Sequence, residues 1–196
     1  MAQKIYLEFR ALMDAGKPDE ARAMVRKKAE NGDVEAQAFM GNGYYLGNFD
    51  GLDYEKALYW SEKAALQGNV QAIHTLGCLY LYGYGVDADP KRGCALLEEA
   101  TRKGDMKSPR YLGLAALEGL NGEKDPQKAR EWFLLGAEKG DVTSQYQLGR
   151  IYENGIGVEP DLETAIAWYK KAAVRTDHVG KPANDALARL KAEGKL

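Results

Sequence analysis

The apolar residues of this chain lie at the three- and four-residue spacing of amphipathic helices. Ala36, Met40 and Tyr44 form one apolar stripe, and Gly47 then ends the predicted helix. A second helix is predicted directly after this loop, and its stripe consists of Ala57, Trp60, Ala64 and Ala65. A glycine–asparagine turn follows, where a left-handed C-cap is favoured. The pattern therefore predicts a pair of helices joined by a loop.

This helix pair recurs with a fixed period of 36 residues and without insertion or deletion. A fixed period of this length is typical of a solenoid, in which each unit packs mainly on its neighbours. We therefore expect an all-α chain of about eleven helices that forms a single domain over residues 1–196. The predicted repeats span 36–71, 72–107, 108–143 and 144–179, with helical caps at 1–35 and 180–196.

A glycine inside the first helix of every repeat indicates close packing at that position. The column consists of Gly41, Gly77, Gly113 and Gly149. A glycine there costs about 1 kcal/mol relative to alanine, so a bulky group is expected to press against the helix. We expect this group to be the indole of the second helix, in the column of Trp60, Trp132 and Trp168.

The fourth repeat carries the most complete motif, with Leu148-Gly149, then Gly155-Ile156-Gly157-Val158, then Ala165-x-x-Trp168. This motif resembles the Sel-1-like repeat, which is similar to the tetratricopeptide repeat but has a longer loop inside the hairpin. The resemblance implies a right-handed α/α superhelix whose first helices line a concave face. It also implies a bacterial scaffold or adaptor that binds proteins.

The columns of the first helix that do not belong to the apolar stripe are the candidates for that concave surface. They differ between repeats, and they include tyrosine and arginine, which anchor many protein interfaces. The candidate partner-binding residues are Asn42, Tyr45, His74, Cys78, Leu81, Tyr82, Arg110, Leu114, Tyr146, Arg150, Glu153 and Asn154. The alternative is that Tyr45, Leu81 and Leu114 pack against the neighbouring first helix. Likewise, Cys78 can be a small packed side chain and His74 a packed one.

Composition narrows the class of partner. The formal net charge of −2 argues against a general nucleic-acid binder, which needs a strong basic stripe. No stretch approaches the roughly 20 apolar residues of a membrane span. The two cysteines lie in one repeat, so we expect reduced thiols in a cytoplasmic protein. The N-terminus lacks a signal-peptide pattern, although removal of such a segment would leave a secreted or periplasmic location open.

The sequence offers little catalytic chemistry. His74 and His178 are far apart, and no motif for a metal site, a nucleotide site or a catalytic nucleophile occurs. We therefore expect neither enzyme activity nor a cofactor nor a metal, and we expect a monomer that binds a protein or peptide in its groove. An assembly adaptor, a regulatory scaffold and a toxin-immunity protein fit equally well. The alternative from another class is an envelope protein that binds carbohydrate or peptidoglycan.

Overall fold

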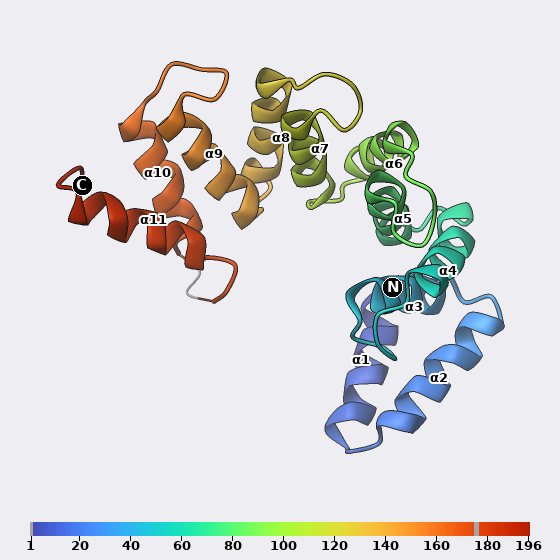
Figure 1. The fold of residues 1–196 in the computed structure, drawn as a ribbon. Helices are drawn as coiled ribbons and strands as arrows, with labels where there is room; N and C mark the ends of the chain where they lie inside the picture. The colour runs from blue at the N-terminus through green and yellow to red at the C-terminus, as the bar shows by residue number, and fades with distance from the viewer. Residues whose placement is uncertain (1, 175–176) are drawn as a thin grey trace. The chain divides into compact units, whose positions relative to one another are not determined.

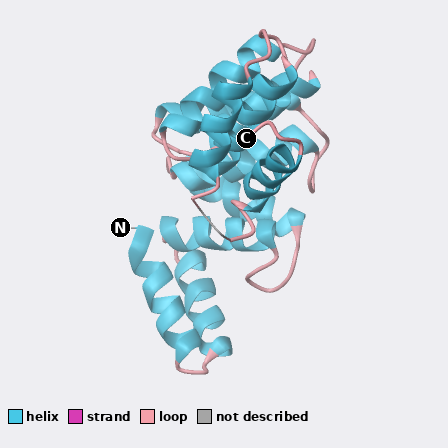
Figure 2. Cartoon of the chain, turned by 90° about the vertical axis from the view of Figure 1, so that its left-hand side faces the viewer, coloured by secondary structure: helices cyan, strands magenta, loops and turns pink. Residues whose placement is uncertain are grey.

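The structure, a computed structural model, describes residues 2–174 and 177–196 and is all-helical over them (Figures 1 and 2). The eleven helices in these ranges confirm the prediction of an all-α chain built from helix pairs. Their bounds are α1 Ala2–Asp14, α2 Pro18–Glu30, α3 Val34–Leu46, α4 Tyr54–Leu66, α5 Val70–Tyr82, α6 Pro90–Arg102, α7 Ser108–Glu118, α8 Pro126–Glu138, α9 Val142–Asn154, α10 Leu162–Ala172 and α11 Lys181–Ala192.

The chain divides into two compact units, Met1–Asp105 and Met106–Leu196. In unit 1 each helix packs on the next one along the chain, and α3 also contacts both α1 and α5. In unit 2, α7 packs on α8, α8 on α9, α9 on α10, and α10 on α11. The first helices of the helix pairs are therefore α1, α3 and α5 in unit 1 and α7, α9 and α11 in unit 2.

The ends of the helices follow from two repeating positions in the sequence. The first helix of each repeat ends at a glycine with positive φ, as predicted for Gly47, whose φ is 72°. The second helix begins after an aspartate whose side chain accepts a hydrogen bond from the third following backbone N–H, as Asp161 does from Thr164 at 3.0 Å. These caps fix the loop within each helix pair.

The glycine column marks a close contact between the two helices of a pair, but the group that lies over it is not the predicted indole. A Cβ on Gly77 would lie 2.8 Å from Leu97, and one on Gly113 would lie 2.7 Å from Phe133. The equivalent contacts are Ser61 over Gly41 and Tyr169 over Gly149. The residue after the tryptophan column therefore fills this space in every repeat.

The correction has a geometric reason. One residue along an α-helix rotates the side-chain direction by about 100°, so two adjacent side chains cannot both point at the same glycine of the neighbouring helix. Phe133 and Tyr169 are fully buried, whereas the indoles of Trp60, Trp132 and Trp168 are only half-buried. Trp168 instead packs at the edge of the core cluster that contains Phe133 and Leu148.

Candidate functional site

The twelve predicted binding residues fall into groups that differ in exposure. Arg150 and Asn154 are exposed. Seven are half-buried, namely Asn42, Tyr45, Tyr82, Arg110, Leu114, Tyr146 and Glu153. His74, Cys78 and Leu81 are buried, so the prediction that these three lie on an accessible face is wrong. The packing alternative describes them better, because α5 packs against α3, α4 and α6.

The buried residues of α5 form a polar chain inside unit 1. The imidazole Nδ1 of His74 lies 3.2 Å from Oδ2 of Asp105, and its Nε2 lies 3.8 Å from Sγ of Cys78. Burial alone would lower the pKa of His74, but the hydrogen bonds to Asp105 and Cys78 raise it to about 9. His74 is therefore a protonated, paired side chain of the interior.

Two other predicted residues are also used within the fold. The guanidinium of Arg110 lies 3.3 Å from Asp141 and donates to the Thr143 hydroxyl at 3.2 Å, which links α7 to the start of α9. Tyr45 belongs to a tyrosine cluster in unit 1, in which the rings of Tyr54 and Tyr84 stack at 4.7 Å. Both side chains therefore make contacts within the fold.

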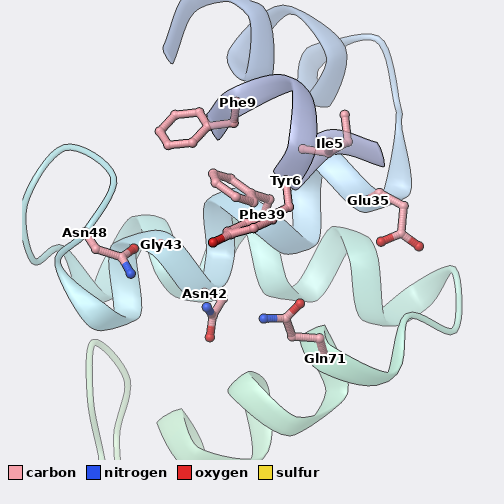
Figure 3. A pocket seen from close by; sticks show the side chains of 9 residues that line it. All are labelled: Ile5, Tyr6, Phe9, Glu35, Phe39, Asn42, Gly43, Asn48 and Gln71. Atoms are coloured by element: carbon pink, nitrogen blue, oxygen red, sulfur yellow. The ribbon is translucent and has the colours of Figure 1, made fainter. Parts of the chain in front are cut away.

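A hollow of about 460 Å³ opens between the first helices of unit 1 (Figure 3). One side is apolar and aromatic, and the other side carries amide and carboxylate groups. Its lining residues are Ile5, Tyr6, Phe9, Glu35, Phe39, Asn42, Gly43, Asn48 and Gln71. They come from α1, α3, the loop after α3, and α5. Of the predicted residues, Asn42 lies here.

The aromatic side of this hollow is a fixed surface. The rings of Phe9 and Phe39 lie 4.9 Å apart, and both lie within about 6 Å of the buried ring of Phe49. Such tilted and edge-on arrangements are the favourable ones for aromatic pairs. Tyr6, which is 50% exposed, extends this surface toward solvent.

The polar side of the hollow consists of groups that the fold does not use. Among the described residues, the side-chain amides of Asn42, Asn48 and Gln71 have no hydrogen-bond partner. Each amide offers both donors and an acceptor. Figure 3 shows the amides of Asn42 and Gln71 near each other, below the aromatic rings.

A second hollow, of about 660 Å³, lies in unit 2 between the first helices α9 and α11. It contains the four candidate residues of the fourth repeat, and most of its other lining residues are charged or polar. The lining residues are Tyr146, Arg150, Glu153, Asn154, Tyr169, His178, Lys181, Pro182, Asp185, Ala186 and Arg189. The predicted residues therefore include the α9 wall of this hollow but not the α11 wall.

Glu153 on α9 is hydrogen-bonded to both α10 and α11 in this second hollow. It accepts a hydrogen bond from the Tyr169 hydroxyl at 2.7 Å and one from the Arg189 guanidinium at 2.6 Å. Burial raises the pKa of Glu153, but these two hydrogen bonds outweigh burial and lower the pKa below its usual 4.5. Glu153 is therefore an ionised residue that attaches α11 to α9.

Tyr6, Phe9 and Gln71 were not among the predicted residues, because the N-terminal helix is expected to be a cap and the candidates come from only four columns of the first helix. One signal was present. Glu35 and Gln71 occupy the same repeat position, one period apart, and both line the hollow of unit 1. Polar residues that recur beside an aromatic stripe would have suggested this surface.

Two further features are missing from the described part of the chain. It holds no group of three or more His, Cys, Asp or Glu side chains placed to bind a metal ion. None of the helices described there has both the length and the apolar character needed to cross a bilayer.

Comparison with known proteins relates the chain to one repeat family. Residues 34–69, 70–105, 110–141 and 142–173 match the Sel1 repeat. A Sel1 repeat protein from Oxalobacter formigenes is 28% identical, with a TM-score of 0.81 over 96% of this chain and 76% of that one. No curated protein matches the chain.

Two further solved structures are similar. A protective antigen of uropathogenic Escherichia coli is 36% identical, with a TM-score of 0.70 over 82% of this chain. The match covers 34% of that antigen, so this chain spans about a third of its length. A Klebsiella pneumoniae Sel1 repeat protein is 22% identical, with a TM-score of 0.65 over 97% of this chain and 93% of that one, and shows the shared fold.

Proposed function

The chain belongs to the Sel1 repeat family, and on that premise we propose that it is a non-enzymatic interaction module that binds an extended segment of a partner protein. The observation that carries this proposal is the hollow of unit 1, which combines an aromatic surface with unused amide groups. The same mode of binding would serve an assembly adaptor, a regulatory scaffold or a toxin-immunity protein.

The aromatic surface supplies the apolar part of such an interface. Phe9, Phe39 and Tyr6 offer large, rigid side chains that lose little conformational entropy when a partner covers them. The rings of Phe9 and Phe39 are held in place by Phe49 and by the packing of α1 on α3. An apolar side chain of the partner would bury against these rings without rearranging the fold.

The amides supply the polar part. A peptide in extended conformation presents backbone N–H and C=O groups that lose their water when they enter a hollow, and each of them then needs a partner. Asn42, Asn48 and Gln71 carry donors and acceptors that the fold leaves open among the described residues. They would bind the partner's backbone beside the buried apolar side chain.

The proposal is tested by affinity capture from a native lysate with a variant that combines Tyr6→Ala and Gln71→Ala. The two side chains make no hydrogen bond that the fold needs, so the variant should keep its helical signal and its melting temperature. A matched control is Tyr59→Ala on α4, since Tyr59 is 53% exposed and lies outside the hollow.

We expect a partner that wild type and the Tyr59→Ala control retain and the double variant loses. A partner retained equally by all three proteins would contradict the assignment to this hollow. If wild type retains no protein, the alternative hypothesis of carbohydrate binding should be tested next, with peptidoglycan fragments as the probe.

A further inference from the structure

The hollow of unit 2 has a different chemistry from that of unit 1. Its lining includes three permanent cations, Arg150, Lys181 and Arg189, and two carboxylates, Glu153 and Asp185. The lining therefore carries an excess of one positive charge, although the whole chain carries a net charge of −2. A local charge of opposite sign to the whole molecule favours an acidic ligand at this place.

The excess charge belongs to Arg150. Arg189 is compensated by Glu153 at 2.6 Å and by Glu193 at 3.3 Å. Lys181 pairs with Asp185 at 2.7 Å. By contrast, the Arg150 guanidinium donates only to the neutral amide of Gln147, at 3.1 Å, and within the described residues it meets no carboxylate.

Lys181 is a second cation that can pair with a ligand in this hollow. Lys181 and Asp185 are an exposed pair, with side chains 70% and 64% accessible, and such surface pairs contribute little to stability. An incoming carboxylate could therefore share Lys181 at small cost. The hollow would then offer an acidic segment two cations, Arg150 on α9 and Lys181 on α11.

The hollow also has apolar contact surface. The Tyr146 ring packs against Tyr169 with the centroids 5.8 Å apart, and Pro182 and Ala186 contribute apolar atoms from α11. A volume of about 660 Å³ exceeds what a single inorganic anion fills and suits several residues of a polypeptide.

We propose that the hollow of unit 2 binds an acidic segment of a partner protein, with one of its carboxylates paired to Arg150 and a neighbouring apolar side chain on Tyr146. This inference rests on the proposed function as an interaction module and names the chemistry of the partner at this second hollow. A nucleic-acid strand is the less favoured occupant, because it carries a phosphate at every nucleotide whereas the hollow offers one cation without a carboxylate partner, Arg150.

The test uses the full chain and two short fluorescent peptides, one in which Glu alternates with Leu and a matched one in which Gln replaces Glu. We expect the Glu peptide to bind at least about tenfold more tightly, and Arg150→Glu to remove that difference. A third peptide, with Lys in place of Glu, should bind Arg150→Glu better than wild type. Lys181→Glu is the second variant, and exposed Lys170→Glu on α10 is the control of equal charge change.

Equal affinity for the Glu and Gln peptides would overturn the proposal, and so would an Arg150→Glu effect no larger than that of Lys170→Glu. Tight binding of a single-stranded oligonucleotide that Arg150→Glu abolishes, without preference for the Glu peptide, would overturn it in favour of nucleic acid. A lysate partner that depends on Tyr6 and Gln71 would still support the interaction module if the acidic peptide fails, so the two failures are distinguishable.

Discussion

The imidazole Nδ1 of His74 lies 3.2 Å from the carboxylate Oδ2 of Asp105, and this pair joins the first helix of the second repeat to the last residue of unit 1. The His74 side chain is 9% accessible and that of Asp105 is 17% accessible. A charged pair so far from solvent is held by its hydrogen bonds, and removing one member leaves the other charge unpaired in the interior.

Asp105→Asn should therefore destabilise the protein. The amide keeps the shape of the carboxylate but not its charge, and we expect a loss of about 1.5–3 kcal/mol, the range for a hydrogen bond to a charged group. Urea denaturation followed by circular dichroism measures it. The matched control is Asp185→Asn, which removes an exposed carboxylate and should change stability by less than about 0.5 kcal/mol.

The same pair predicts how stability depends on pH. The pKa of His74 rises from 6.5 to about 9 on folding, because the hydrogen bonds to Asp105 and Cys78 outweigh burial. Its contribution is therefore fully present below pH 6.5 and is lost as the pH rises through about 9. Denaturation series across this window should show wild type losing stability relative to His74→Gln. Parallel curves for the two proteins would contradict the protonated pair.

The glycine column predicts a second effect on stability. A Cβ on Gly149 would collide with the ring of the fully buried Tyr169, so Gly149→Ala should cost about 1–3 kcal/mol in spite of the better helix propensity of alanine. Thermal denaturation measures it. Arg150→Ala, at an exposed position of the same helix, is the control and should change stability by less than about 0.5 kcal/mol.

A substitution at Ser61 should change stability in the opposite direction. Its side chain is fully buried over Gly41, and no hydrogen-bond partner of its Oγ is found in the described part of the chain. A buried hydroxyl without a partner costs free energy, so Ser61→Ala should leave stability unchanged or raise it by up to about 1 kcal/mol. A clear loss in a denaturation experiment would mean that the hydroxyl finds a partner in solution.

The repeat itself could be predicted from the sequence, because its signals are local. A glycine that ends a helix, an aspartate that begins one, and an apolar stripe each act through neighbours within a few residues. The same local signals led to the wrong prediction that Trp168, and not Tyr169, lies over Gly149. Which of two adjacent bulky residues faces the neighbouring helix depends on how each helix is rotated about its axis relative to the other. The apolar stripe of one helix alone does not determine this rotation.

The candidate site was predicted only in part, because exposure depends on contacts between distant segments. His74, Cys78 and Leu81 have the same repeat positions as residues that stay accessible elsewhere, yet they are buried. In the case of His74, the partner is Asp105, in the turn that follows α6. The α9 wall of the second hollow was identified because the same columns carry Tyr146 and Arg150 there.

The attachment of the last helix gives the final prediction. Glu153 accepts hydrogen bonds from Tyr169 and Arg189, so Glu153→Gln should leave the array folded but loosen α11. Amide hydrogen exchange should quicken in α11 and change little in α7 and α8. Because folding lowers the pKa of Glu153 below 4.5, its contribution is present above pH 4.5 and is lost as the pH falls further. Exchange in α11 that is the same in both proteins would show that apolar packing of Leu190 alone holds the helix.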